Sequence, residues 1–191
     1  DDATVIDGPV RFPAHRSGDV VIGQSLTMHL ATVGPRPRAD EQLLEALDTL
    51  RLTGRGGGHF PTSRKWRSVR DGVRRTGVPA TVVANAAESE PASAKDLALL
   101  VQRPHLVLDG LVSAAEAVGA RDLVVWTHGD AHALHRILVE ALQERRAALD
   151  EPFIRLVSGP AGYISGESSA ILRALAGGPA PVLAPAAAAS D

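Results

Sequence analysis

The chain has 191 residues, with 20 basic and 22 acidic side chains and a formal net charge of −2 at pH 7. This length suits one well-buried domain, because single domains commonly span about 100 to 200 residues, and the near-neutral charge argues against disorder or a globally basic nucleic-acid binder. The sequence contains no cysteine, which excludes disulfides, thiolate catalysis and cysteine-held zinc or iron–sulfur centres within it.

The two ends of the sequence differ from its middle. Residues 1–39 contain Gly and Pro at irregular intervals and one apolar patch at Val20–Ile22, so an irregular N-terminal arm is predicted. Residues 40–181 alternate between helical and strand patterns and are expected to form the folded domain. Residues 182–191 are a low-complexity Ala/Pro tail that is not expected to contribute to a core.

Two helices are predicted between residues 40 and 76. The first begins after the N-cap candidate Asp40, continues through leucines at helical spacing, and ends before the glycine-rich run 54–58. The second is expected to be capped by Thr62, with Trp66 on its apolar face. Its other side is rich in arginine and could bind nucleic acid, but no stacking aromatics accompany these charges, so a solvated face is favoured.

Three short apolar runs are predicted to be buried strands, at 80–84, 123–126 and 153–157. Helical patterns alternate with them: one from Lys95 to Val118 that is interrupted by Pro104, one that follows Asp130 as a cap, and one that begins near Gly166. This alternation predicts an α/β fold with a Rossmann-like parallel sheet and helices on both faces. Ligands of such folds bind at the carboxyl ends of the strands, so the loops after Ala84, Trp126 and Val157 should line a cleft.

Three segments carry candidate binding groups. The first contains glycines at positions 54 and 56–58, whose backbone could approach a phosphate or a flat ring. Its spacing matches neither common phosphate-binding motif and a flexible turn is the alternative, although Arg55 and Lys65 favour an anion. The second, 85–91, offers an amide and two carboxylates, which could instead cap a helix. The third, 162–168, offers a ring, hydroxyls and a carboxylate at a strand-to-helix turn.

In this order, the three segments resemble the FMN- and NADH-binding flavoprotein (51 kDa-type) subunit of NADH:quinone oxidoreductase, respiratory complex I, and its shorter actinobacterial homologues. The resemblance extends over about residues 43–181. The matching residues are Gly54–Gly57, Phe60–Thr62 and Lys65–Trp66, then Asn85–Ala86, Glu88, Glu90–Pro91 and Lys95–Asp96, and finally Gly162–Ile164 and Gly166–Glu167.

The resemblance implies a binding role for each matching position. The flavin and its phosphate would be held by Gly54, Arg55, Gly56, Gly57, Lys65, Asn85, Glu88, Tyr163, Gly166 and Glu167. The dinucleotide would contact Phe60, Glu90 and Ser168. Hydride would pass from NADH or NADPH to FMN, so that no side chain need act as a catalytic acid or base, and the electrons would go to a separate ferredoxin-like protein or membrane reductase.

Some positions depart from the family pattern, which usually has Gly at positions 59 and 63, Asp at 87, Cys at 165 and a second Glu at 168. The family also continues past residue 181 into domains that include four cluster-ligating cysteines. The resemblance therefore leaves two functions open: an FMN-dependent NAD(P)H dehydrogenase module without its own iron–sulfur cluster, or a degenerate flavin- or nucleotide-binding module that serves assembly or regulation.

Metal, nucleic-acid and membrane sites are not expected. His128, His132 and His135 have spacings that could converge on a metal, but no carboxylate or cysteine completes a convincing set. No apolar run approaches the roughly 20 residues that a membrane-spanning helix needs, and the acidic start does not resemble a signal peptide. A cytoplasmic protein, possibly peripheral to a membrane complex, is the expectation.

Overall fold

The structure is a computed structural model that describes residues 23–54, 58–88, 93–159 and 168–176. Three parallel strands, adjacent in the order β1-β2-β3, form the sheet within these ranges. This arrangement confirms the predicted α/β class. The elements are α1 (Leu26–Thr32), α2 (Glu41–Thr49), α3 (Thr62–Thr76), β1 (Thr81–Asn85), α4 (Lys95–Gln102), α5 (Pro104–Val118), β2 (Asp122–His128), α6 (His132–Ala148), β3 (Ile154–Gly159) and α7 (Ser168–Leu175).

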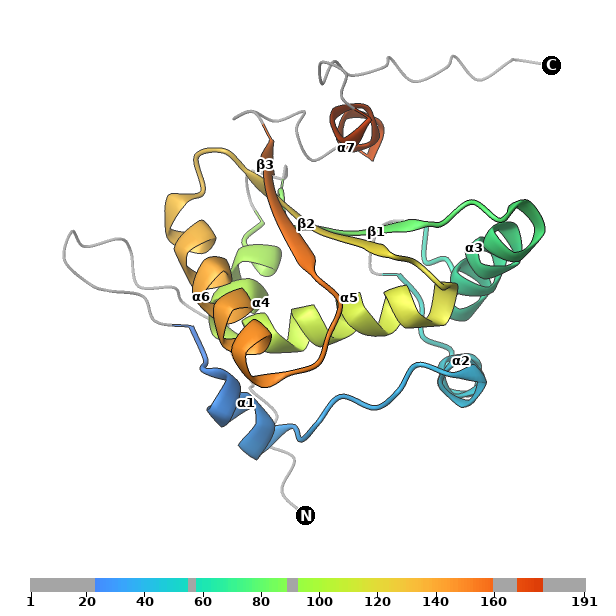
Figure 1. Cartoon of the computed structure of the whole chain (residues 1–191), viewed down its shortest axis with the longest axis horizontal. Coiled ribbons are helices and arrows are strands. Elements are labelled where there is room, and N and C mark those ends of the chain that lie inside the picture. Colours follow the sequence, from blue (N-terminus) through green and yellow to red (C-terminus); the bar gives the residue numbers. More distant parts are fainter. Residues whose placement is uncertain (1–22, 55–57, 89–92, 160–167, 177–191) are drawn as a thin grey trace.

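Alternate residues of the central strand β2 build two separate cores. Leu123 and Val125 face the larger core, which contains buried residues of α4, α5 and α6. Trp126 faces the opposite side and packs with Ala87 and with Ile171 of α7. Figure 1 shows α5 and α6 below the sheet and α7 above it. Helices therefore lie on both faces, as the strand pattern predicts.

Capping and helix-stop residues in the sequence explain where several helices begin and end. The Asp40 side chain accepts a hydrogen bond from the Leu43 N–H at 3.2 Å, which confirms it as the N-cap of α2. Gly119 ends α5 in the left-handed region at φ +73°, a conformation that glycine adopts without steric cost. Pro104 is the first residue of α5, where its missing N–H is harmless, so α4 and α5 are separate helices.

Two predicted caps are wrong. Thr62 is the first helical residue of α3 and follows Pro61; its own N–H donates to the Leu52 carbonyl at 3.0 Å, so its backbone is already part of the closed α2–α3 connection. Helix α6 begins at His132 after Ala131, without a side-chain cap. Asp130 contributes its backbone carbonyl to the His132 N–H at 2.9 Å instead of its side chain.

The described part of the segment predicted to be an irregular arm, residues 23–39, contains the short helix α1. Ser25 caps it by accepting a hydrogen bond from the Met28 N–H at 3.3 Å. Leu26 and His29 are buried against the rest of the domain, so tertiary contacts stabilise a helix that is too short to show a periodic pattern in the sequence. Residues 1–22 of the predicted arm and the tail 182–191 lie outside the described residues.

No helix in the described ranges has both the length and the apolar character that crossing a lipid bilayer requires.

Candidate functional site

The carboxyl ends of the three strands lie together at one edge of the sheet. The Ala86 N–H, just after β1, donates to the Trp126 carbonyl of β2 at 2.7 Å. His128 at the end of β2 donates from Nε2 to the Glu88 carbonyl at 3.1 Å, and the hydroxyls of Thr127 and Ser158 lie 3.2 Å apart. The loops that follow β1 and β2 are therefore joined, and β3 ends beside them.

Asn85 is the exposed last residue of β1. Its Oδ1 accepts a hydrogen bond from the Ala87 N–H at 3.1 Å, which turns the chain sharply at the strand end. Ala87 is 5% exposed and packs against Trp126 and Ile171. Because an aspartate at this position would place a carboxylate against apolar side chains, the alanine that departs from the family pattern fits its local surroundings.

Glu88 is bound to the start of α4. Its carboxylate accepts hydrogen bonds from the Lys95 ammonium at 2.8 Å, from the Asp96 N–H at 3.1 Å and from the Ser93 hydroxyl. Burial raises the pKa of Glu88, but these hydrogen bonds outweigh burial, so the pKa lies below the ordinary value for glutamate. The carboxylate is thus ionised at neutral pH, and it stabilises the first turn of α4.

The glycine-rich connection between α2 and α3 is closed at its base. Thr53 and Pro61 form an antiparallel bridge, and the Gly54 N–H donates to the Phe60 carbonyl at 2.9 Å. The Phe60 side chain is exposed. His59 occupies the left-handed region at φ +41°, where residues with a Cβ are uncommon. The backbone there has a conformation suited to the glycine usual in the family, although the residue is histidine.

Lys65 lies in the first turn of α3 and is exposed. Within the described ranges its ammonium makes no ion pair, whereas Arg67 and Arg70 on the same helix bind Glu41 at 2.6 Å each. The cation at position 65 is therefore available for an external anion. Arg67 and Arg70 lie on the arginine-rich side for which the sequence favoured a solvated face over a nucleic-acid site, and they bind an acidic residue of the chain itself.

The remaining predicted site residues fall into two groups. Ser168 is exposed and is the first residue of α7. Arg55, Gly56, Gly57, Glu90, Tyr163, Gly166 and Glu167 lie outside the described residues, so their predicted roles stay predictions. The structure places Asn85 at the end of β1 and Glu88 in the turn that follows. Gly54, Phe60 and Lys65 lie around the start of α3.

Gly159, the last residue of β3, has a role that the sequence alone did not reveal. A Cβ built on it would lie 2.3 Å from Trp126 Cζ2 and 2.8 Å from Cε2. The indole thus lies directly over this backbone, and only glycine leaves room for it. The contact connects the ends of β2 and β3 and fixes the ring beside Ala87.

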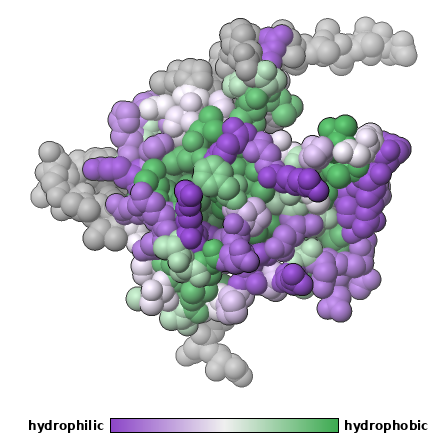
Figure 2. Space-filling view, in the orientation of Figure 1, coloured by the Kyte–Doolittle hydropathy of each residue, from purple (hydrophilic) through white to green (hydrophobic). Residues whose placement is uncertain are grey.

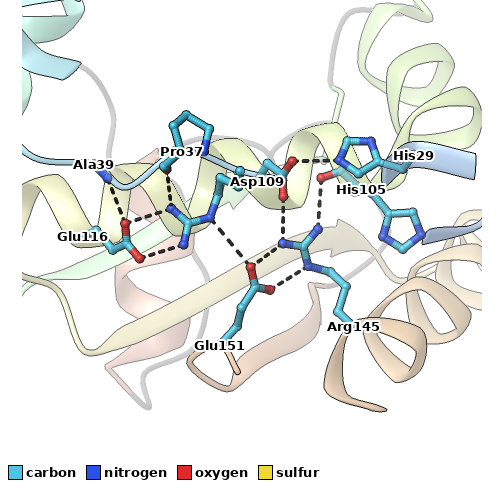
Figure 3. A network of polar contacts seen from close by, with 9 residues as sticks. His29, Pro37, Ala39, His105, Asp109, Glu116, Arg145 and Glu151 are labelled. Carbon is cyan, nitrogen blue, oxygen red and sulfur yellow. Dashed lines mark hydrogen bonds and ion pairs between the residues drawn. The ribbon is translucent and has the colours of Figure 1, made fainter. Parts of the chain in front are cut away.

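A polar network away from the strand ends was also missed, because its members come from four separate segments. Asp109 accepts from His29 Nε2 and from Arg145 Nη2, each at 2.8 Å, and Glu151 accepts from Arg145 at 2.8 and 2.7 Å (Figure 3). Burial lowers the pKa of nearby His105, and the Arg145 charge lowers it further, despite the opposing effect of Glu144. No three potential metal ligands cluster in the described part of the chain.

Comparisons with known proteins agree with the sequence resemblance. Residues 47–190 match the family described as Nuo51 FMN-binding domain. A subunit of the NADH-quinone oxidoreductase of Aquifex aeolicus is 32% identical over 72% of this chain and 34% of its own length. The alpha subunit of the NAD-reducing hydrogenase HoxS of Cupriavidus necator is 36% identical over 72% of this chain and 24% of its own.

A solved structure shows the same arrangement. The crystal structure of the NAD+-reducing NiFe hydrogenase in the H2-reduced state superimposes with a TM-score of 0.65 and 27% identity, over 88% of this chain and 31% of the other. The chain therefore spans about a third or less of the length of these relatives.

Proposed function

The chain belongs to the Nuo51 FMN-binding family, and from this premise we propose that it is an FMN-binding module that accepts hydride from NADH or NADPH. The observation that supports this most directly is the convergence of the β1, β2 and β3 carboxyl ends at one edge. Such an edge is the usual ligand site of a doubly wound parallel sheet.

The described residues offer donors and acceptors that fit a flavin mononucleotide. Lys65 presents a cation without an ion-pair partner in the described ranges, which suits the phosphate. Asn85 is exposed at the end of β1, where the resemblance implies an amide beside the ribityl chain. Phe60 offers an exposed ring for stacking on the dinucleotide.

The bound flavin would supply the hydride-accepting chemistry, and the protein would supply orientation and a partly dry surface. Trp126, Ala87 and Ile171 form an apolar layer next to the strand ends. Because these side chains are apolar apart from the indole N–H, they can limit water access and do not act as acids or bases. A separate redox protein, such as a ferredoxin-like protein or a membrane reductase, would take up the electrons.

The contacts of Glu88 and the apolar side chain of Ala87 favour a second function. The Glu88 carboxylate is already occupied by Lys95, Ser93 and Asp96, and position 87 offers no polar side chain to a flavin. A module that binds flavin or nucleotide for assembly or regulation, without turnover, accounts for both features. Anaerobic NADH separates the two functions: bleaching of the bound flavin supports the dehydrogenase, and a flavin that stays oxidised supports the non-catalytic module.

The phosphate role of Lys65 can be tested by titrating the purified chain with FMN and with riboflavin, which lacks the phosphate. Loss of one charge-assisted contact to phosphate should cost roughly 1.5–3 kcal/mol, so Lys65→Glu should weaken FMN binding at least about tenfold. Riboflavin binding should change little. Arg64→Glu, an exposed neighbour on the same helix, is the matched control. Equal losses for both ligands would contradict the phosphate contact, and no binding of either ligand would contradict the flavin function.

A further inference from the structure

β3 is an edge strand: it pairs with β2 on one side, and no other described strand lies on its far side (Figure 1). In a parallel sheet, alternate residues of an edge strand point their backbone N–H and C=O groups away from the neighbouring strand. Ile154–Gly159 therefore presents a row of donors and acceptors outward. Native proteins usually protect such an edge with charge, proline or a covering element, because it pairs readily with another strand.

An apolar groove lies beside this edge, between β3 and the second half of α6. Its volume is about 530 Å³, and its lining includes Val139, Leu142 and Leu156. Phe153 stands at the rim with 68% of its surface exposed, and the Arg146 guanidinium lies 5.8 Å from the centroid of its ring. Figure 2 shows apolar surface in the middle of the face on which β3 lies in front.

The charges around the edge favour a copy of the same surface as its occupant. Arg155 is the charged residue of β3, and Asp122 binds its guanidinium at 2.9 and 2.7 Å, so this charge does not repel an incoming strand. The groove is lined by both signs, including Arg146 and Asp150. A surface with both signs can complement itself about a two-fold axis, whereas a strongly acidic or strongly basic partner would meet like charge.

We propose that β3 pairs antiparallel with β3 of a second copy of this chain, which joins the two sheets into one. A two-fold axis perpendicular to the sheet places α6 of both copies on the same face, so the two grooves close against each other and bury Val139, Leu142 and Phe153. With the axis at Leu156, each Arg155 lies opposite Val157 of the other copy and the two arginines do not face one another. This interface is independent of the flavin function, because it lies along the side of the sheet and not at its strand ends.

Sedimentation of the full chain over a range of concentrations tests the interface. The wild-type chain should dimerise, and Phe153→Glu should raise the dimer dissociation constant on the order of 100-fold, since both copies lose an apolar anchor and gain a charge. Val78→Glu is the control, because Val78 is 64% exposed and lies before β1, at the opposite edge of the sheet. A wild-type monomer at all concentrations, or equal weakening by both substitutions, would overturn the proposal.

A crosslinking experiment tests the register independently of affinity. The chain has no cysteine, so Leu156→Cys introduces one thiol per copy at the proposed axis, where opposed Cβ atoms of antiparallel strands lie about 4.5–5.5 Å apart. Mild oxidation should give a covalent dimer on a non-reducing gel. Val78→Cys should remain monomeric. Crosslinking of the Val78 variant without crosslinking of the Leu156 variant would place the interface elsewhere and refute the β3 pairing.

Discussion

The contact between Gly159 and Trp126 makes a sharp prediction about stability. In Gly159→Ala the new Cβ would lie 2.3 Å from Trp126 Cζ2, whereas carbon atoms in contact need about 3.5 Å. The ring or the strand must therefore move by about 1.2 Å, the difference between these distances. Trp126 is 1% exposed and packs against Ala87 and Ile171, so the ring cannot move into solvent.

The expected magnitude follows from two opposing effects. Overpacking a core commonly costs about 1–3 kcal/mol, and this displacement belongs at the upper end. Replacing glycine by alanine also restricts the unfolded chain, which returns about 0.4–1 kcal/mol. The net loss in the free energy of unfolding should therefore be about 2 kcal/mol, measured by urea denaturation with far-UV circular dichroism.

Two further variants make the assay decisive. Gly110→Ala is the matched control, because a Cβ on this helical glycine of α5 meets no atom within 4 Å, and it should stabilise the chain by about 0.5–1 kcal/mol. Trp126→Phe replaces the indole, whose Cζ2 makes the closest contact, with a smaller single ring, so combining it with Gly159→Ala should cost less than the sum of the single changes. Additive losses, or a Gly159→Ala chain as stable as wild type, would refute the argument from close packing.

The polar network and its histidines yield two more predictions. The folded chain binds a proton at His105 less readily than the unfolded chain, since burial and the Arg145 charge lower its pKa. The free energy of unfolding should therefore fall as the pH drops below the ordinary imidazole pKa of 6.5 and stop falling below the folded-state value. His105→Gln should flatten this slope in urea titrations between about pH 7.5 and 5, while His132→Gln at an exposed position should leave it unchanged; a slope that survives His105→Gln would disprove the assignment. Asp109→Ala leaves His29 Nε2 and one Arg145 contact without their carboxylate, so it should cost about 2–4 kcal/mol in the same assay. Asp71→Ala, whose side chain is 65% exposed, should cost less than about 0.5 kcal/mol, and similar losses for the two variants would contradict a structural role for the network.

The sheet was predictable because its signals are local and repeated. Apolar β-branched runs separated by long helical patterns predict parallel strands, and the pairing of Val83 with Val124 and of Trp126 with Val157 confirms them. Helix α1 was not predictable in this way. Its stability depends on burying Leu26 and His29 against α5 and α6, and seven residues are too few for a period to appear.

For the binding residues, the sequence predicted which residue types stand at which positions, but not what their side chains contact. The three segments indicated a family, but the sequence does not state whether a carboxylate faces a ligand or the chain's own backbone, since both uses need the same residue. Glu88 illustrates this, because the helix-capping interpretation that the sequence left open is the one its contacts with Lys95 and Asp96 favour.

A residue that differs from the family pattern can be interpreted only when its backbone conformation and its packing are known. His59 occupies the left-handed region at φ +41°, a conformation that glycine, the residue that the resemblance leads us to expect there, adopts without steric cost. Ala87, in contrast, has exchanged a polar position for an apolar one and packs beneath Trp126 and Ile171. On the proposed function, we therefore expect Lys65 to contribute more to the FMN affinity than the turn after β1 does. Comparing the effect of Lys65→Glu with that of Asn85→Ala on FMN affinity measures this division directly, and a larger loss from Asn85→Ala would reverse it.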